Sequence, residues 1–250
     1  MTGGRSRAKL SVNVNKVATL RNSRGGALPN VVEATKVCLA AGAPGITVHP
    51  RADARHITFA DVREIAGELA PLKGRIEFNI EGDPRPDLLQ LVHDVKPTQC
   101  TLVPVKPGEI TSEAGWSTHT PRDFMRKIVA AMQEHGVRVS LFVDADEEAV
   151  RWAADMGADR VELYTEPFAR AFEQGAAAAD VSFATFAAAA EQAHALGLAV
   201  NAGHDLDLEN LMMFRRLPYL AEVSIGHALV SHALFVGLSR SVREYLNVLA

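Results

Sequence analysis

The sequence predicts a single (β/α)8 barrel that spans residues 1–250 as one domain. Short apolar, β-branched segments alternate eight times with longer stretches of helical period, and glycines mark many of the joins. No linker-like segment divides the chain, and α/β barrels commonly run about 200–250 residues as one domain. An open doubly wound sheet is the alternative, but neither of the glycine-rich motifs that would favour it, G-x-G-x-x-G and G-x-x-x-x-G-K-[ST], occurs here.

Strands are expected where apolar and β-branched residues cluster between turn-forming residues. The predicted strands are Leu10–Val14, Gly45–Val48, Arg75–Ile80, Gln99–Val103, Val137–Val143, Arg160–Leu163, Ala199–Asn201 and Ala221–Ile225. Helices are expected where apolar residues recur every three or four positions. The predicted helices are Pro29–Ala41, Thr58–Ala70, Pro86–Val95, Pro121–His135, Glu147–Met156, Val181–Leu196, Leu208–Arg216, Leu229–Leu234 and Ser239–Val248.

Several helix ends have a local cause. Thr120 is predicted to cap the helix that has Pro121 in its first turn, and Asp144 or Asp146 to cap the next. The alanine-rich stretch Phe172–Ala190 is expected to be helical, with an extra helix before the sixth helix of the barrel. Glycines that follow an apolar helical stretch and precede a strand are expected in the left-handed conformation that ends a helix. These glycines are Gly42, Gly136, Gly157 and Gly197.

Composition limits the classes of partner and compartment. The chain has 26 basic and 30 acidic residues and a net charge of −4, so a nucleic acid is not expected as its partner, whereas small phosphorylated ligands need only a local cluster of donors. Cys38 and Cys100 lack metal-ligand spacing, which predicts neither a disulfide scaffold nor a zinc site. No apolar run follows the basic N-terminus, and the most apolar stretch, Ser224–Leu238, is too short to span a membrane. A cytoplasmic protein is therefore expected.

Polar residues gather immediately after the predicted strands, where the active sites of such barrels are built. Histidines are the clearest group, and four of the nine lie at strand ends or in the loops after them: His49, His56, His204 and His227. A single loop histidine commonly donates to a backbone carbonyl, but four that converge on one barrel mouth indicate a functional site. By contrast, His93, His135 and His194 lie in predicted helices and are interpreted as surface or packing residues.

Cations and carboxylates complete this constellation. The basic residues predicted around the mouth are Lys16, Arg21, Arg24, Arg51, Arg55 and Lys106. Together with backbone N–H groups after Gly203 and Gly226, they indicate a site for more than one phosphate or carboxylate. Glu81 and Glu162 lie at inward strand positions, where they either pair with a cation such as Arg51 or transfer protons.

Metal and Schiff-base chemistry are disfavoured. The cluster from His204 to Asp207 invites a metal, but there is no H-E-x-x-H motif and no H-x-H after the first strand. Neither Lys16 nor Lys106 lies in the apolar setting that would depress the pKa of a nucleophilic amine. Neither a metal site nor a Schiff-base lysine is therefore expected.

Six segments, in order along nearly the whole chain, resemble the pyridoxine 5′-phosphate synthase family. The most specific are the stretches HPR…RHI, within Gly45–Ile57, and NAGH, within Val200–His204. The others are Ser11–Gly25, Phe78–Gly82, Ser140–Asp146 and Ser224–Ala228. The resemblance implies a (β/α)8 barrel with a few extra helices, assembled as a homo-octamer.

The resemblance also implies a transferase of vitamin B6 biosynthesis. Such an enzyme condenses 1-deoxy-D-xylulose 5-phosphate with 3-amino-2-oxopropyl phosphate, giving pyridoxine 5′-phosphate, phosphate and water without a metal or organic cofactor. Building a pyridine ring from two ketones requires imine formation, loss of water and phosphate, and carbon–carbon closure. These steps need several proton donors and acceptors.

Matched residue by residue, the resemblance implies that His49 and Glu81 are general bases, that His204 is a general acid and that Glu162 stabilises charge. The positions that hold the aminoketone phosphate are Asn13, Arg24, Asp205, Gly226 and His227. The positions that hold the pentulose phosphate are Asn15, Lys16, Arg51, His56 and Thr111.

The chain departs from the best-known members of the family at three of these positions. Asp205 stands where those members have a glycine, and Asn15 and Lys16 replace an Asp-His pair. Lys16 still supplies a cation for phosphate, although it cannot readily act as a base.

The segment Lys106–Thr118, after the fourth strand, is long and carries Gly108 and Gly115, and we predict that it closes over the mouth as a lid. Two other functions are weighed against the synthase. One is a different sugar-phosphate isomerase or aldolase on the same barrel. The other is a phosphate-binding barrel without catalysis, which is disfavoured because four acid–base residues are all present.

Overall fold

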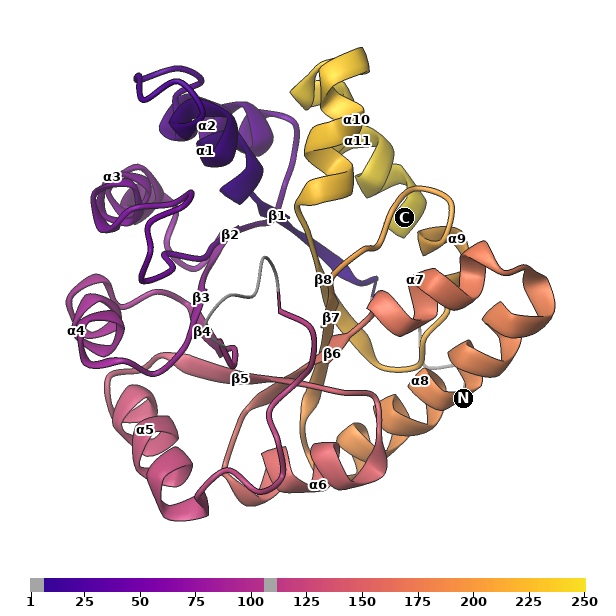
Figure 1. Cartoon of the computed structure of the whole chain (residues 1–250). Helices are drawn as coiled ribbons and strands as arrows, with labels where there is room; N and C mark the ends of the chain where they lie inside the picture. The colour runs from indigo at the N-terminus through magenta and orange to yellow at the C-terminus, as the bar shows by residue number, and fades with distance from the viewer. Residues whose placement is uncertain (1–6, 106–111) are drawn as a thin grey trace.

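The computed structural model describes residues 7–105 and 112–250. Eight parallel strands follow one another around a closed barrel in chain order, and the last strand pairs with the first (Figure 1). Both the (β/α)8 fold and the strand order predicted from the sequence are confirmed. The strands are β1 (Lys9–Asn13), β2 (Gly45–Val48), β3 (Glu77–Gly82), β4 (Gln99–Leu102), β5 (Arg138–Val143), β6 (Arg160–Tyr164), β7 (Ala199–Gly203) and β8 (Leu220–Ile225).

Helices surround the barrel as an outer layer (Figure 1). Along the described chain they are α1 (Asn15–Asn22), α2 (Val31–Ala40), α3 (Phe59–Leu69), α4 (Pro86–Val95), α5 (Arg122–Glu134), α6 (Glu147–Asp155), α7 (Glu166–Glu173), α8 (Ala176–Ala195), α9 (Leu211–Phe214), α10 (His227–Val236) and α11 (Leu238–Leu249), with a short 3-10 turn, η1 (Ala70–Leu72).

Several predicted helix ends are confirmed, and others are wrong. The four glycines predicted to end helices all have positive φ, between 75° and 102°. Asp146 caps α6, because its side chain accepts from the amide of Ala149, whereas the alternative cap, Asp144, accepts from Gly115 N at 3.0 Å. Thr120 is not a cap: Pro121 stands in the N-cap position of α5, without a side-chain cap.

Three segments differ from the prediction. Residues 15–22, expected as a loop, form α1, because Val17 and Ala18 are buried on one side of a short helix. The extra helix expected near the alanine-rich stretch is α7, which lies almost wholly before that stretch, and the longer α8 begins five residues before the predicted helix. The helix predicted at Leu208–Arg216 shrinks to α9, because the Asp207 carboxylate accepts from the amides of Glu209 and Asn210 in a turn that delays the helix.

Alternation along each strand separates two environments. Outward residues such as Leu10 and Val12 are fully buried, so the apolar core is the shell between the barrel and its helices. Inward residues are mostly polar, whereas most barrels of this type fill their interior with branched apolar side chains. Ser11 and Thr47 hydroxyls lie 2.6 Å apart, and the Thr101 hydroxyl donates to the Asn79 side chain at 3.0 Å. A hydrogen-bonded polar interior therefore leads up to the mouth.

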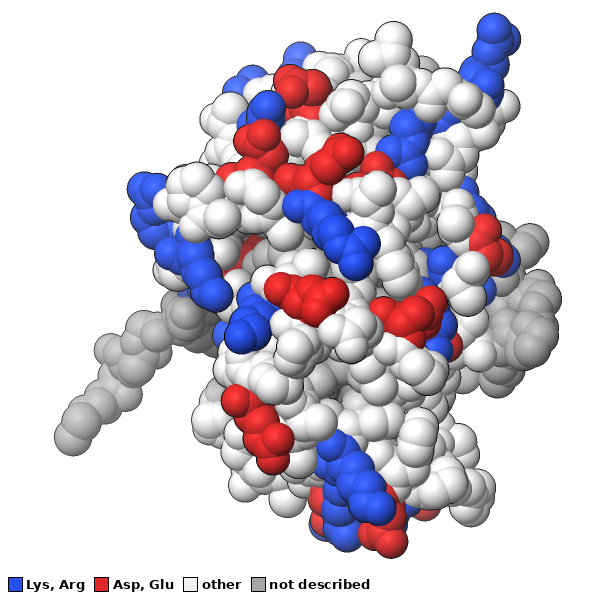
Figure 2. Space-filling view, turned by 90° about the vertical axis from the view of Figure 1, so that its left-hand side faces the viewer, with Lys and Arg blue, Asp and Glu red and all other residues white. Residues whose placement is uncertain are grey.

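Charges of both signs are interspersed on the outer surface. Figure 2 shows the side of the molecule that carries α3 and α4, where acidic and basic side chains alternate and neither sign forms a continuous field. Among the described helices, none combines the length and the apolar composition that crossing a membrane requires. Cys38 and Cys100 are both buried and free, so no disulfide joins them.

Candidate active site

A cavity of about 520 Å³ lies at the C-terminal ends of the strands, where the sequence places the chemistry. The four predicted acid–base residues, His49, Glu81, Glu162 and His204, all line it. So do most of the predicted substrate contacts: Asn13, Asn15, Lys16, Arg51, His56, Asp205, Gly226 and His227.

Glu81, on β3, lines this cavity. Its carboxylate accepts from Asn13 Nδ2 and from Ser224 Oγ, both at 3.4 Å, and His49 Nδ1 lies 3.9 Å away. Burial raises the pKa of Glu81 to about 8; the Ser224 hydrogen bond opposes this shift and the charge of Glu222 adds to it. A carboxyl group with such a pKa exchanges protons near neutral pH.

Glu162 faces the same space from β6. Thr101 Oγ1 donates to its carboxylate at 3.4 Å, and Gly203 on the neighbouring strand leaves room for its other oxygen. A Cβ atom on Gly203 would lie 2.4 Å from Glu162 Oε1, so this position must be glycine for the carboxyl group to stay where it is. Burial, followed by the charge of Glu81, raises the pKa of Glu162 well above its ordinary value.

The histidines after β2 are buried and neutral. Burial, with His56 and the cations Arg51 and Arg85 nearby, lowers the pKa of His49 to about 3. Its Nε2 atom has no hydrogen-bond partner among the described residues and is fully enclosed, as a base awaiting a substrate proton would be. The His49 amide donates to Asn15 Oδ1 at 2.9 Å, so α1 fixes where this loop begins.

His56 stands beside His49, with the two ring centroids 6.0 Å apart. Burial, with the charge of Lys16, lowers the pKa of His56 to about 4. Its Nδ1 accepts from the amide of Ile57 at 3.0 Å, which places the proton of the neutral ring on Nε2. His56 is therefore a neutral donor at the edge of the cavity.

The loop after β8 offers a binding site for anions. Gly226 precedes the first turn of α10, and Gly226, His227 and Ala228 all line the cavity. A helix N-terminus directs backbone N–H groups and a partial positive charge at whatever binds there. Asn13 crowds Gly226: a Cβ atom there would lie 3.0 Å from the Cβ of Asn13.

The predicted cations are only partly gathered at the mouth. Lys16, Arg51 and Arg55 line the cavity. Arg21 turns away to α3, where it pairs with Asp61 at 2.5 Å. Arg24 is exposed in the loop after α1 and does not line the cavity. Lys106 and Thr111, and with them the first half of the predicted lid, lie outside the described residues.

The later part of the predicted lid is tied to the barrel. The Trp116 amide donates to the Phe142 carbonyl and its indole donates to the Leu102 carbonyl, at 2.9 and 2.8 Å. Ser112 lines the cavity, so this segment reaches the mouth. Whether the whole segment closes over bound substrates stays a prediction.

Some cavity residues were not predicted as site residues. Arg170 is the most consequential, because it adds a cation from α7, a helix whose bounds were not predicted. Ser224 could have been found from strand alternation, since it lies on β8 two residues after the inward Glu222. The other cavity residues outside the predicted set include Thr19, Ser112 and Phe142.

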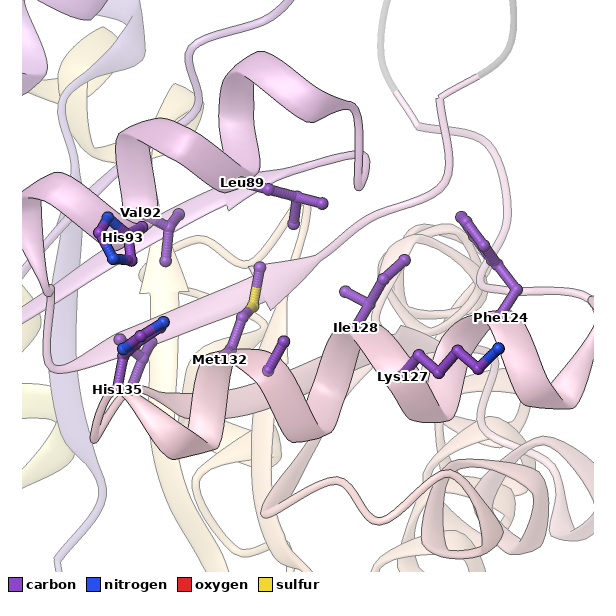
Figure 3. A pocket seen from close by; sticks show the side chains of 10 residues that line it. Leu89, Val92, His93, Phe124, Lys127, Ile128, Met132 and His135 are labelled. Carbon is purple, nitrogen blue, oxygen red and sulfur yellow. The ribbon is translucent and has the colours of Figure 1, made fainter.

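A second cavity, of about 270 Å³, lies outside the barrel between α4 and α5. Figure 3 shows Leu89 and Val92 of α4 opposite Ile128 and Met132 of α5, with His93 and His135 at one end. Its lining is almost wholly apolar and includes no carboxylate, so the chemistry belongs to the barrel mouth. Within the described parts of the chain, no three His, Cys, Asp or Glu residues are grouped to hold a metal ion.

Comparisons with known proteins agree with this geometry. Solved barrels share the fold at low identity: a structure described as native KDPGal covers 98% of this chain and 95% of its own, with a TM-score of 0.61 and 9% identity. Phosphoribosylanthranilate isomerase of Thermotoga maritima covers 97% of this chain and 98% of its own, with a TM-score of 0.58 and 13% identity. These likenesses show the fold alone.

Sequence relatives are much closer. Pyridoxine 5′-phosphate synthase of Bacteroides thetaiotaomicron is 54% identical over 242 residues, which are 96% of this chain and 99% of the relative. The synthase of Christiangramia forsetii is 50% identical over the same shares. A family model described as pyridoxal phosphate biosynthesis protein PdxJ matches residues 10–250. The chain therefore belongs to the PdxJ family.

Proposed function

We propose that this chain is a pyridoxine 5′-phosphate synthase, a transferase-type enzyme of vitamin B6 biosynthesis. It condenses 1-deoxy-D-xylulose 5-phosphate with 3-amino-2-oxopropyl phosphate, and it releases pyridoxine 5′-phosphate, phosphate and water. The observation that carries this proposal is the convergence of two histidines and two buried carboxyl groups, His49, His204, Glu81 and Glu162, on one cation-rimmed cavity. Family membership and relatives named for this activity support it.

His49 and Glu81 act as general bases in this proposal. His49 is neutral at physiological pH, since burial lowers its pKa to about 3, and its enclosed Nε2 has no hydrogen-bond partner among the described residues and can accept a proton. Glu81, whose pKa burial raises to about 8, takes up and returns protons as the ring is built. Both face one reacting molecule, because the carboxylate and the imidazole lie 3.9 Å apart.

Glu162 and His204 stabilise charge and donate protons, whereas His49 and Glu81 accept them. Burial raises the pKa of Glu162 well above its ordinary value, which favours the protonated form, and that form can donate a hydrogen bond to a developing oxyanion or ionise beside a cationic imine. His204, at the end of β7, is the general acid that protonates departing water or phosphate. Several groups at different atoms match a reaction that eliminates, condenses and cyclises.

Two phosphate sites are assigned to neighbouring parts of the cavity wall, since β8, β1 and β2 are adjacent in the barrel. The N-terminus of α10, with Asn13, Gly226 and His227, holds the aminoketone phosphate, and the family resemblance also places Arg24 and Asp205 at this phosphate. The wall built by α1 and the loop after β2 holds the pentulose phosphate through Asn15, Lys16, Arg51 and His56, to which Thr111 is added. All of these phosphate-binding residues except Arg24 and Thr111 line one cavity, which supports their assignment.

We propose that the reaction needs no metal and no organic cofactor, because imine formation, the eliminations and ring closure are all steps that side chains can assist by proton transfer. The family resemblance favours a homo-octamer, and exposed apolar side chains such as Leu28, Leu234 and Phe235 are suited to contacts between subunits. Two buried, free cysteines suit a reducing compartment such as the cytoplasm.

The experiment that tests this function supplies both substrates to purified protein treated with a chelator. Pyridoxine phosphate fluorescence and released phosphate are expected to rise together, and neither is expected when one substrate is omitted. Conversion of the pentulose phosphate alone would contradict the proposal and favour an isomerase or aldolase. Binding of both phosphates without turnover would favour a non-catalytic barrel. Light scattering measures the oligomer in the same preparation.

A further inference from the structure

Asp205 makes its closest contact with the histidine that precedes it, in the loop after β7. His204 Nδ1 and Asp205 Oδ2 lie 2.9 Å apart, which is hydrogen-bond distance. The Tyr164 ring meets the His204 ring edge to face, with centroids 5.0 Å apart and an interplanar angle of 77°. The imidazole is thus held on one side by an aromatic ring and on another by a carboxylate.

The backbone at this point is unusual and firmly held. His204 and Asp205 have φ values of 88° and 60°, in the left-handed region that favours glycine. The Thr165 hydroxyl donates to the carbonyl oxygens of Gly203 and His204, and Asn210 Nδ2 donates to the Asp205 carbonyl at 3.0 Å. Neighbouring elements therefore keep two residues in a conformation that side chains disfavour, as often occurs at functional sites.

A carboxylate is an unexpected neighbour for a phosphate, because the two anions repel each other. The hydrogen bond with His204 lowers the pKa of Asp205, and the charges of Arg170 and His227 lower it further, whereas burial opposes the shift. The group therefore stays ionised at neutral pH. Arg170 reaches the cavity from α7 and offsets its charge. The other titratable groups interacting with Tyr164 in this corner are Glu113, Asp144 and Glu166.

We propose that Asp205 is a positioning residue, which orients His204 for acid catalysis instead of holding substrate phosphate. This inference rests on the proposed synthase function, in which His204 is the general acid. By accepting from Nδ1–H, Asp205 fixes the tautomer and the rotation of the ring, so Nε2 is the nitrogen that takes up a proton abstracted earlier in the reaction and then delivers it to the leaving group. While Nε2 carries that proton, the carboxylate remains beside the doubly protonated ring as its counter-charge.

Two substitutions separate this role from a structural one. Asp205→Gly relieves a left-handed backbone and removes the carboxylate, so the folded protein should be at least as stable while catalysis falls. Asp205→Asn keeps the size and the backbone preference but replaces the charged acceptor with an amide. Loss of a partner that orients a functional histidine typically costs about 10- to 100-fold in activity, so we expect kcat to fall at least about tenfold in both variants.

Asp94→Asn is the matched control. Asp94 also lies beside a histidine that precedes it, with His93 Nδ1 and Asp94 Oδ1 3.4 Å apart, but this pair is exposed on α4, outside the cavity. The kcat of the Asp94→Asn enzyme, and its KM for each of the two substrates, are expected to equal those of the unmodified enzyme.

The decisive readout is the tautomer of His204, measured by ¹⁵N NMR and assigned by comparison with His204→Gln. The Nδ1–H form is expected in the unmodified enzyme and the Nε2–H form in Asp205→Gly. An unchanged tautomer, or a change in KM alone with kcat retained, would overturn the proposal and leave Asp205 a ligand of phosphate or a bystander. If the unmodified enzyme makes no pyridoxine phosphate, the proposed function fails, whereas the NMR arm still reports on the contact.

Discussion

The acid–base residues of the cavity differ in burial, and burial determines which protonation state each one favours. His49 is neutral and Glu81 and Glu162 favour their protonated forms, because all three are enclosed and charge is costly there. His204 is one-fifth exposed and keeps its carboxylate partner. The bases therefore lie inside the barrel mouth, and the proposed acid lies nearer its rim.

Removing either proposed base tests this division. His49→Ala and Glu81→Gln are each expected to lower pyridoxine phosphate formation by about 10²- to 10⁴-fold, the usual contribution of general acid–base groups. Glu81→Gln keeps the shape of a side chain that favours its protonated form, so folding should be undisturbed. Initial rates with both substrates measure the effect, and His135→Ala, on the outer surface after α5, is the matched control for the histidine. Activity retained in both base variants would refute the assigned roles.

Arg170 offers a second test at the residue scale. It adds positive charge to the cavity, and its own ion pairs with Glu166 and Glu173 are exposed and contribute little to folding. Arg170→Gln is expected to raise KM for one phosphorylated substrate about three- to fivefold, in line with an exposed charge contact, with little change in kcat. The increase should shrink as salt is added. Arg151→Gln, in an exposed pair on α6, should change neither constant.

At the scale of elements, strand alternation predicts the carboxyl groups of the site, whereas position after a strand predicts its histidines. Inward positions such as Glu81 and Glu162 follow from a period of two, and the structure places both in the cavity. Arg21 shows the limit, because its pairing with Asp61 on α3 depends on a tertiary contact between distant segments. Arg170 was missed because a short helix with Glu166 and Pro167 in its first turn was not separated from the alanine-rich stretch after it.

Gly203 on β7 leaves the space that the Glu162 carboxyl group of β6 occupies, and this dependence is testable. Gly203→Ala would place a Cβ atom 2.4 Å from Glu162 Oε1, so the carboxyl group must move. We expect a loss of at least about tenfold in kcat, as for a displaced catalytic group, and about 1–3 kcal/mol of stability from overpacking. Gly67→Ala, in open space on α3, is the matched substitution and should be neutral or stabilising. An active Gly203→Ala enzyme would show that Glu162 need not stay in place.

The whole molecule places its apolar core in the shell around the barrel and fills the interior with polar side chains. Glu222, near the bottom of the barrel, is protonated at neutral pH, because burial and the adjacent Glu77 raise its pKa to about 8. Burial by itself raises the pKa of Glu77, but hydrogen bonds to Glu222 and Lys9 and the charge of Arg138 bring it down to about 2. One proton is therefore shared by this pair, and the barrel keeps protonated carboxyl groups along its length.

These carboxyl groups predict how stability depends on pH. In the unfolded chain, glutamates ionise near pH 4.3, whereas in the folded protein the pKa values of Glu81 and Glu222 are about 8 and that of Glu162 is also raised by burial. Between about pH 6.5 and 8 the folded state thus binds more protons, and the free energy of unfolding must fall as pH rises. Below that interval His49 and His56, with lowered pKa values, act in the opposite direction, because they gain protons on unfolding.

Urea unfolding at several pH values across this interval measures the slope. Each carboxyl group that is protonated only in the folded state contributes at most about 1.4 kcal/mol per pH unit. Glu222→Gln replaces a protonated acid with a neutral side chain of the same shape, away from the cavity. The decrease in the free energy of unfolding with pH should therefore become shallower, by at most the contribution of one carboxyl group. The stability at pH 6.5 should change little. A free energy of unfolding that is flat or rises between pH 6.5 and 8 would mean that water or cations ionise these carboxyl groups inside the barrel.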